Sequence, residues 1–579
     1  MSDILYGFIT ALSPINLIAA CVSVAIGITI GALPGLSAAM GVALLIPITF
    51  GMPASTGLIV LAGVYCGAIF GGSISAILIR TPGTPAAAAT AIDGYELTVQ
   101  GKAGKALGTA VIASFIGGIL SSISLYLFAP TLATLALKFG PAEYFWLSIF
   151  GLTIIAGAST KSITKGLISG GLGLMISTIG MDPMLGNPRF TFGIPSLLSG
   201  VPFTASLIGL FSMSQVLMLA EKKIKSSGKM IDFDDRVLLS RAELKQIFPT
   251  TLRSTVIGNL IGILPGAGAS IASFLGYNEA KRFSKHKEEF GHGSIEGIAG
   301  AEAANNAVTG GSLIPTFTLG IPGESVTAVL LGGLLIQGLQ PGPDLFTIHG
   351  KITYTFFAGF IIVNIFMLLL GLTGSKMFAR ISRVPDNYLI PLIFSLSVIG
   401  SYAINNQMTD VGIMFVFGII GYFVNKFQLN SASIVLALIL GPIGEAGLRR
   451  SIILNHGNID ILFKSSVSKV LILFTILSLF SFVTAAIFPF VFTTGVSFFN
   501  SSLATAPITA TGLPPAKIFS GLYLNIIFPP SLAIQPLWPY PIYLLPVVLE
   551  HCHTYLHYFL LHLHFYHQCS SYLSFFPLQ

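Results

Sequence analysis

The sequence predicts an all-α polytopic membrane protein with two repeats of transmembrane helices, each interrupted by broken or re-entrant helices. Three observations support this class: the composition, a series of apolar runs, and a helix-breaking motif that occurs twice. Of the 579 residues, 53% are hydrophobic and only 9% are charged, whereas a soluble domain carries about 25% charged residues. The mean hydropathy is +0.85. Because one span needs about 20 apolar residues, the runs predict about 12 transmembrane helices.

The first apolar run covers residues 15–33 and ends at Pro34-Gly35. The preceding MSDILYGF lacks the Lys or Arg of a cleavable signal, so we expect the run to remain as a membrane helix. The next run, 36–50, is short and contains Pro47, which predicts a half-helix or re-entrant arm. Further spans or arms are expected at 57–79, 106–128, 144–158, 166–179, 197–220, 251–264, 267–275, 297–318, 326–339, 353–372, 389–402, 411–424, 433–443 and 470–490.

A short motif appears once in each half of the chain. Gly27 to Ala38 reads GITIGALPGLSA, and Gly258 to Ala269 reads GNLIGILPGAGA. Both fit G-x-x-I-G-x-L-P-G-x-x-A at the end of an apolar run. Pro removes a backbone donor and Gly adds freedom, so a helix should break at each motif. In lipid such a break is tolerated where its free backbone groups line a cavity or a ligand.

A second pair of motifs follows the first in the same order. Gly71-Gly72-Ser73 precedes Pro82-Gly83, and Gly310-Gly311-Ser312 precedes Pro322-Gly323. Matched breaks in two halves are typical of transporters with inverted repeats, in which the binding site lies where the repeats meet. The order and spacing of the four breaks therefore predict two repeats.

The charges predict how the chain is divided. Lys and Arg are scattered or gathered in short loops, which favours positive-inside topology over nucleic-acid binding for this net charge of +7. We predict a first transmembrane repeat at 1–220 and a basic cytoplasmic linker at 221–250. A second repeat with C-terminal helices is predicted at 251–495, followed by an atypical tail at 496–579.

The residues after each break are the candidate substrate site. A half-helix N-terminus presents unpaired N–H groups and the positive end of the helix dipole, which favour a carboxylate. The alternative is that these residues only cap and pack the broken helices; for Arg80, it is an arginine that snorkels to the interface. The candidates are Gly35, Ser37, Arg80, Thr81, Gly83, Thr84, Gly266, Gly268, Ser270, Gly323 and Ser325.

Polar residues inside apolar runs are candidates for a coupling ion. The set is Asn259, Glu302, Asn305 and Asn306. They could hold Na⁺ or a proton, or they could join helices by hydrogen bonds. Asp93 and Glu324 are the other acids near the break motifs. Each could carry a coupling proton or help hold Na⁺, or be a loop or interface acid, and we select neither. No resident cofactor or metal is expected.

Several function classes are disfavoured by missing motifs. The sequence has no H-E-x-x-H, no G-x-S-x-G and no P-loop, so we do not expect an enzyme or an ATPase. Its four cysteines have no C-x-x-C spacing.

Long strings of the sequence resemble one family. They are GALPGLSAAMGVALLIP from Gly31, GGSISAILIRTPGTPAAAATAIDGY from Gly71, QGKAGKALG from Gln100, ILPGAGASIASFLGYNEAKRFSK from Ile263, GSIEGIAGAEAANNAVTGGSLIPTFTLGIPGE from Gly293 and QGLQPGPDLF from Gln337. Over about residues 1–495 the chain resembles the large membrane subunit of the tripartite tricarboxylate transporters, the TctA family.

That resemblance implies a permease in the bacterial inner membrane. It would receive a carboxylate from a periplasmic solute-binding protein, work with a small membrane subunit, and use a Na⁺ or H⁺ gradient. It also implies inverted repeats that move as an elevator. A passive anion channel, a stand-alone carboxylate carrier and a membrane-embedded enzyme remain as alternatives.

The tail departs from the family pattern. From about Ser501 it is rich in Pro and then in His, with His553 and His557 at a possible metal-ligand spacing. No acidic or Cys pattern completes a metal site, so we interpret the tail as a non-family extension. We expect truncation after about Phe499 to leave transport intact.

Overall fold

The computed structural model of the chain describes most residues up to 479. The described ranges are 3–158, 163–182, 184–221, 237–264, 266, 268–381, 384 and 386–479. All of them lie in one compact unit, Met1–Thr493. The tail predicted at 496–579 and residues 222–236 of the basic linker lie outside the described residues, and so does Pro265 of the second break motif.

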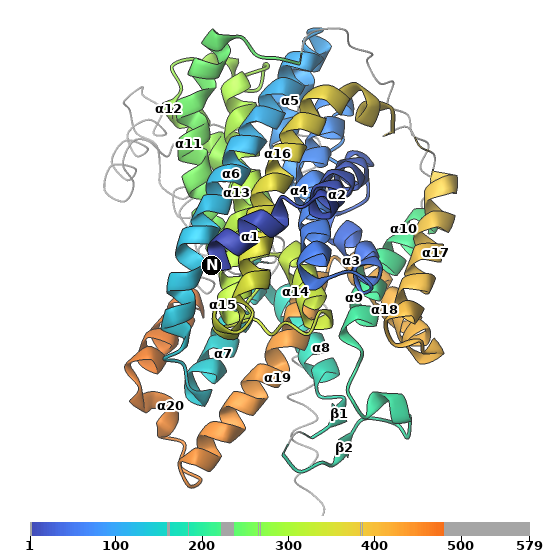
Figure 1. Ribbon diagram of the computed structural model, residues 1–579, viewed down its shortest axis with the longest axis vertical. Coiled ribbons are helices and arrows are strands. Elements are labelled where there is room, and N and C mark those ends of the chain that lie inside the picture. Colours follow the sequence, from blue (N-terminus) through green and yellow to red (C-terminus); the bar gives the residue numbers. More distant parts are fainter. Residues whose placement is uncertain are drawn as a thin grey trace, which may run out of the picture. The chain divides into compact units, whose positions relative to one another are not determined.

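The first half begins with helices separated at the predicted breaks (Figure 1). α2 ends just before Pro34-Gly35, and a turn with Gly35 at φ +91° leads into the short α3. α4 ends at Arg80, which has φ +56°, and the chain restarts as a 3₁₀ turn. The bounds are α1 (Asp3–Ala11), α2 (Pro14–Ala32), α3 (Ala38–Thr49), α4 (Ala54–Ile79), η1 (Pro85–Ala88) and α5 (Thr90–Val99).

The second half repeats this order of elements. α11 ends before the second motif, and α12 begins at Gly268. α13 ends at Gly320, which has φ +70°, and α14 restarts at Ser325. The bounds are α11 (Arg241–Ile263), α12 (Gly268–Phe283), η4 (Lys287–Glu289), α13 (Ile295–Leu319), α14 (Ser325–Ile336) and α15 (Asp344–Thr347). The expected helix breaks are therefore confirmed at all four motifs.

The remaining elements follow each set of broken helices. In the first half they are α6 (Ala103–Ala136), α7 (Pro141–Ala158), α8 (Ile163–Ser177), β1 (Gly180–Met181), β2 (Pro188–Arg189), η2 (Pro195–Leu197), α9 (Phe203–Leu207), the π-helical η3 (Ile208–Met213) and α10 (Ser214–Glu221). In the second half they are α16 (Gly350–Ile381), α17 (Asp386–Asn405), α18 (Met408–Lys426), α19 (Ser431–Leu454) and α20 (Ile461–Lys464).

Some boundaries differ from the predicted ones. α11 starts at Arg241, inside the interval predicted as linker, because Ser240 and Glu243 form a capping box and Glu243 pairs with Lys105 at 2.6 Å. α12 extends to Phe283, beyond its apolar run. The polar connection predicted after α8 contains a short hairpin in which Gly180 pairs with Arg189.

Close backbone contacts bring the two breaks of each half together. α2 packs along α4, and α11 packs along α13. A Cβ at Gly83 would lie 1.9 Å from the carbonyl oxygen of Gly31, and a Cβ at Gly323 would lie 2.3 Å from that of Gly262. Each PG break thus rests on the end of the helix that carries the LPG break, and only glycine fits there.

The later helices of the two halves pack crosswise. α19 lies along α7 and α8, whereas η3 and α10 lie along α17 and α18 (Figure 1). α19 of the second half therefore packs against α7 and α8 of the first half. In the same way, η3 and α10 of the first half pack against α17 and α18 of the second.

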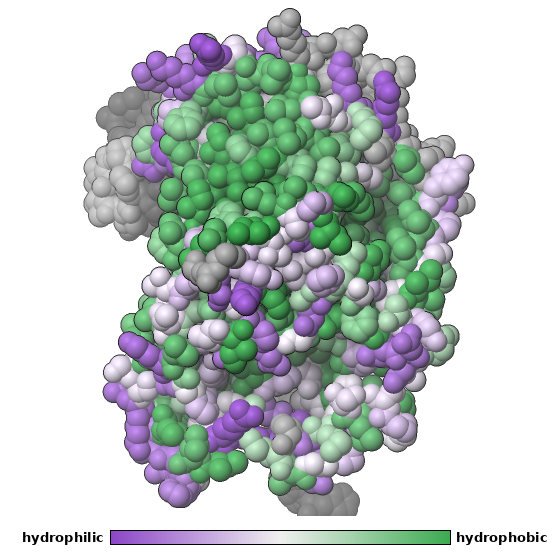
Figure 2. Space-filling model, viewed as in Figure 1, coloured by the Kyte–Doolittle hydropathy of each residue, from purple (hydrophilic) through white to green (hydrophobic). Residues whose placement is uncertain are grey.

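The structure is that of a multi-pass membrane protein. Within the described ranges, eight helices are long and apolar enough to span a bilayer. They lie at Pro14–Ala32, Ala54–Ile79, Ala103–Ala136, Phe203–Glu221, Gly350–Arg380, Asn387–Asn405, Met408–Lys426 and Ser431–Leu454. The count of about 12, which included shorter arms, stays a prediction. Figure 2 shows hydrophobic residues gathered over the upper part of the face in view, below a hydrophilic edge, and mixed with hydrophilic residues over the lower part.

Candidate functional site

The helix breaks lie around one cavity of about 560 Å³. It is bounded by the starts of α3, η1, α12 and α14, by the η3–α10 segment, and by the connection from α18 to α19. The lining residues are Ser37, Ala38, Ala39, Ile69, Thr84, Pro85, Ala86, Leu210, Phe211, Ser214, Gln215, Gly266, Gly268, Ala269, Ser270, Ile271, Glu324, Ser325, Val326, Asn425, Gln428, Leu429, Asn430, Ser431, Ala432 and Leu436.

The first turn of α3 lines the cavity with a serine cap. Ser37 precedes the helix in an extended conformation, and its hydroxyl accepts a hydrogen bond from the Met40 N–H at 3.1 Å. The next two residues, Ala38 and Ala39, also line the cavity. Because a helix N-terminus carries a partial positive charge, this wall favours an anion.

The first turn of α12 is capped by an acid from another element. Oε2 of Glu324 accepts a hydrogen bond from the Ala269 N–H at 3.1 Å. The Gly266 N–H also donates to the Gly323 carbonyl oxygen at 2.7 Å, which joins the two breaks of this half. A protein carboxylate therefore occupies the anion position at this second N-terminus.

Glu324 is the only charged side chain among the described residues that line the cavity. It is 8% exposed. Its Oε1 accepts a hydrogen bond from the Tyr65 hydroxyl on α4. Tyr65 in turn lies 3.2 Å from the hydroxyl of Ser312 on α13. The acid is thus held by α4 and α12 and connected to α13 through Tyr65.

Thr84 occupies the matching position in the first half, because Pro82-Gly83 aligns with Pro322-Gly323. It lines the cavity and is 3% exposed. Its Oγ1 has no hydrogen-bond partner among the described residues. A buried hydroxyl without a partner costs stability, so a ligand that pairs with it gains binding energy.

Neutral amides complete the cavity wall. The side chain of Gln215 on α10 donates to the carbonyl oxygen of Gly35. Oδ1 of Asn430 accepts a hydrogen bond from the Ala432 N–H at 3.0 Å at the start of α19. Asn425 and Gln428 lie nearby in the lining. Sequence reasoning missed these residues because they lie outside the break motifs.

The predicted substrate residues fall into three groups. Those that line the cavity are Ser37, Thr84, Gly266, Gly268, Ser270 and Ser325. Those that form the backbone contacts behind the lining are Gly35, Gly83 and Gly323. Arg80 and Thr81 do not line the cavity.

The side chain of Arg80 is exposed to solvent and contacts two residues of α5. Its guanidinium lies 3.6 Å from the Glu96 carboxylate and over the ring of Tyr95, and the side chain is 63% exposed. No cationic side chain is among the described lining residues of the cavity, so partial positive charge there can come only from helix N-termini.

None of the predicted coupling-ion residues lines the cavity. Glu302, Asn305 and Asn306 are buried, and Asn259 is half-buried. Glu302 accepts hydrogen bonds from the hydroxyl groups of Thr90 on α5 and Ser114 on α6, the latter at 3.0 Å. The side-chain nitrogen of Asn306 lies 3.4 Å from the same carboxylate. These contacts join three helices in the core.

Two other asparagines of that set have unpaired polar atoms. Within the described part of the chain, both side-chain polar atoms of Asn305 lack a partner, and so does Oδ1 of Asn259. Asp93, which we had not selected, accepts hydrogen bonds from the N–H groups of Gly291 and Gly293 at 2.7 and 3.0 Å. Asp93 therefore fastens α5 to the connection before α13.

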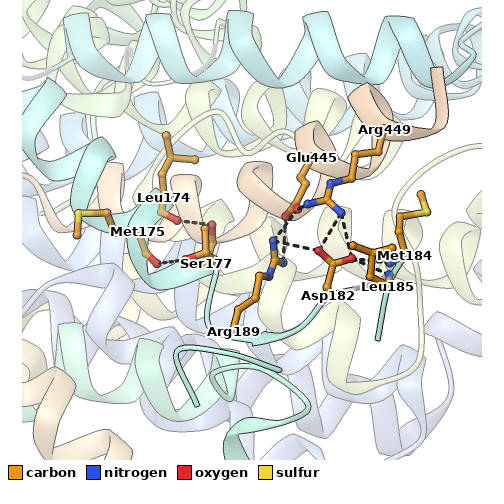
Figure 3. Close-up of polar contacts among 10 residues, drawn as sticks. Leu174, Met175, Ser177, Asp182, Met184, Leu185, Arg189, Glu445 and Arg449 are labelled. Atoms are coloured by element: carbon orange, nitrogen blue, oxygen red, sulfur yellow. Dashed lines mark hydrogen bonds and ion pairs between the residues drawn. The ribbon is translucent and has the colours of Figure 1, made fainter. Parts of the chain in front are cut away.

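A separate charged cluster fixes the hairpin to α19 (Figure 3). Arg189 lies 2.7 Å from Glu445, and Arg449 lies 2.8 Å from Asp182 and 2.9 Å from Glu445. Hydrogen bonds from the backbone N–H groups of Leu185 and Met184, together with Arg449, lower the pKa of Asp182 to about 2.

Apolar helices of spanning length define a multi-pass membrane protein, and a cavity lined by helix N-termini lies among its broken helices. The model of the tripartite tricarboxylate transporter TctA family matches residues 17–436, and the chain belongs to this family. It is therefore a component of a membrane transporter.

Two relatives come from Agrobacterium vitis. One is described as "Uncharacterized 52.8 kDa protein in TAR-I ttuC' 3'region". It is 38% identical over 459 residues, which cover 79% of this chain and 91% of the relative. The other is described as "Uncharacterized protein in TAR-II ttuC' 3'region". It is 40% identical over 201 residues, which cover 35% of this chain and 83% of the relative. No solved structure matches the chain significantly.

Proposed function

We propose that the chain is the membrane-embedded permease subunit of a tripartite, binding-protein-dependent secondary transporter. It imports tricarboxylates or related carboxylates across the bacterial inner membrane, driven by a Na⁺ or H⁺ gradient. The observation that carries this proposal is the cavity into which α3 and α12 direct their N-termini.

The cavity suits a small carboxylate by its size and its polar groups. A volume of about 560 Å³ lies within the range of small-molecule sites. Helix N-termini contribute about half an elementary charge each. Serine hydroxyl groups and the amide of Gln215 supply further hydrogen bonds without adding a fixed positive charge, so a bound anion can leave again.

The architecture supports transport by two inverted repeats. Both halves have the same order of helix, break, helix and break, and their later helices pack crosswise, as expected for repeats related by a two-fold axis. We propose that the broken helices α2–α5 and α11–α14 form the body that carries the substrate, in an elevator-type motion. α7–α10 and α17–α19 form the frame.

The partners follow from the family. Its description names a tripartite transporter, so we propose that a periplasmic solute-binding protein delivers the substrate and that a small membrane subunit completes the complex. No nucleic-acid partner, resident cofactor or metal is proposed. Na⁺ or H⁺ acts only as the coupling ion.

Uptake by proteoliposomes tests the proposal. The full chain is reconstituted with its small subunit, the binding protein is added outside, and a panel of radiolabelled di- and tricarboxylates is tested under Na⁺ and pH gradients varied separately. Accumulation that an ionophore abolishes supports a secondary transporter. Equilibration without accumulation indicates a passive anion channel, and accumulation without the binding protein indicates a stand-alone carrier. If no carboxylate enters under any condition, the proposal fails.

A further inference from the structure

The two halves differ at one position of the cavity. The residue after the PG break is Thr84 in the first half and Glu324 in the second. Both are buried in the lining. The hydroxyl of Thr84 has no partner among the described residues, whereas the carboxylate of Glu324 already occupies the N-terminus of α12. The first half thus offers an open anion position, and the second half holds a fixed negative charge.

A carboxylate substrate and an ionised Glu324 repel each other in one cavity. No cation lies among the described lining residues to offset the two charges, and a partly buried site screens them less than bulk water does. A substrate anion therefore binds well only when Glu324 has been neutralised.

The groups that face Glu324 from its neighbouring elements are neutral. α14 packs against α3, α4, α9, α13 and α19. From α4 come Tyr65 and, beside it, the thiol of Cys66; α12 contributes the Ala269 N–H. α3 and α9 contain no titratable residue.

The charged side chains on α13 and α19 contact residues other than Glu324, or line another cavity. Glu296 accepts a hydrogen bond from Ser284, and Glu302 is held by Thr90 and Ser114. On α19, Glu445 and Arg449 belong to the cluster with Asp182 and Arg189, and Arg450 lines a different cavity.

The partners of Glu324 favour a proton over a metal ion. Both carboxylate oxygens accept hydrogen bonds, one from an O–H and the other from an N–H. Donor groups repel a metal cation, which needs oxygen acceptors around it. A proton requires only that one hydrogen bond change direction. When Oε1 is protonated it donates to the Tyr65 oxygen, and the Tyr65 hydroxyl turns toward Ser312, 3.2 Å away.

The Ser312 hydroxyl can pair with Tyr65 whether Glu324 is ionised or protonated. Its hydroxyl lies 3.4 Å from the carbonyl oxygen of Thr309 and can donate there while it accepts from Tyr65. The set of Glu324, Tyr65 and Ser312 therefore pairs its polar atoms in either protonation state, with no rearrangement of the backbone.

We propose that Glu324 is the proton-binding residue of the transport cycle, and that a proton on its carboxylate and a substrate carboxylate at the α3–Thr84 side occupy the cavity together. This inference rests on the proposed transport function. In each cycle an O–H bond forms at Glu324 with a proton from the side of higher proton concentration. The bond breaks on the other side, after the substrate has left.

The test compares net accumulation with exchange. The probe is the labelled carboxylate that enters wild-type proteoliposomes in the uptake experiment. Glu324→Gln is permanently neutral and keeps both an acceptor and a donor. We expect this variant to lose accumulation driven by a pH gradient and to retain counterflow, in which internal and external substrate exchange at a rate comparable to wild type. Glu302→Gln is the control, because it neutralises a buried acid on α13 that does not line the cavity. If Glu324 rather than this predicted coupling-ion residue binds the proton, Glu302→Gln still accumulates the probe.

Several results would overturn the proposal while the transport function stands. For Glu324→Gln, these results are accumulation under a pH gradient or loss of counterflow. For the control, the result is exchange without accumulation in Glu302→Gln alone. For the wild type, it is uptake that responds only to Na⁺. If Glu324→Gln cannot be purified, proton uptake by the wild-type complex decides. Addition of the probe in weak buffer must make the medium more alkaline, and no change refutes the proposal. Absence of wild-type uptake, in contrast, refutes the transport function itself.

Discussion

Gly83 is the position where a single methyl group should damage the cavity most directly. A Cβ there would lie 1.9 Å from the Gly31 carbonyl oxygen, 2.8 Å from the Ser75 hydroxyl and 3.0 Å from the Cα of Gly72. Two of these neighbours are backbone and cannot swing away. In Gly83→Ala, the PG break must therefore move about 1 Å or more away from the end of α2.

The free-energy cost of this substitution appears either in folding stability or in substrate binding, depending on which part of the protein moves. Overpacking of this kind costs about 1–3 kcal/mol. If the whole protein absorbs the cost, Gly83→Ala unfolds at lower temperature. If the break moves alone, it carries Thr84 and Pro85 out of place in the cavity lining. At about 1.4 kcal/mol per factor of ten, substrate binding then weakens roughly 5- to 150-fold.

The assay pairs thermal unfolding of the purified chain with initial uptake rates in proteoliposomes. Gly412→Ala is the matched control, because Gly412 also lies in a described helix but nothing lies within 4 Å of its added Cβ. In that control the alanine should stabilise α18 slightly, by about 0.5–1 kcal/mol. If Gly83→Ala keeps both its unfolding temperature and its uptake rate at wild-type levels, the close contact between the break and α2 is refuted.

Three further predictions concern other parts of the chain. Thr84→Val removes a buried hydroxyl with no partner among the described residues, so thermal unfolding should show about 1 kcal/mol of added stability while the uptake assay shows weaker carboxylate binding; an unchanged apparent affinity would contradict the role given to Thr84. Arg80→Gln should change uptake by less than about twofold, since an exposed ion pair contributes only about 0–1 kcal/mol; a complete loss of uptake would show that Arg80 contacts the substrate. Because the pKa of Asp182 is lowered from 3.8 to about 2, its stabilisation of the hairpin is present above pH 3.8 and disappears as the pH falls toward 2. Limited proteolysis of the hairpin should therefore be slow at pH 5 in the wild type but fast in Asp182→Asn, and equal rates would refute this role of the cluster.

The helix breaks were predictable because their cause is local. Pro34 and Pro322 cannot continue a helix as backbone donors, and the glycines beside them need no partner elsewhere to act. The same local rule placed Ser37 and Ser325 at helix starts, where both line the cavity. The motif alone thus fixed where the chain turns and which short side chains lie at the turn.

Other contacts at and behind the cavity lining join residues that are far apart in the sequence, so sequence spacing does not reveal them. Gln215 bonds to Gly35, which is 180 residues away, and Tyr65 bonds to Glu324, which is 259 residues away. Tyr65 lies in a long apolar run and looks like a core residue until α13 and α14 are placed beside it. Arg80 illustrates the converse: it lies in a break motif, yet the left-handed turn at the end of α4 leaves its side chain beside Glu96.

In the mechanism that we propose, the difference between Thr84 and Glu324 lets two similar halves take different ligands. Both halves have a GGS helix, a PG break that rests on the end of a neighbouring helix, and a following residue in the cavity lining. The chain then continues as the 3₁₀ turn η1 in the first half and as the helix α14 in the second. A threonine after the PG break leaves a neutral donor beside the serine-capped N-terminus of α3. A glutamate fills the equivalent N-terminus with a charge that can be neutralised. Under the proposed function, a substrate anion and a proton would need no separate binding domains, because one side chain in each of two matched breaks would make the halves complementary.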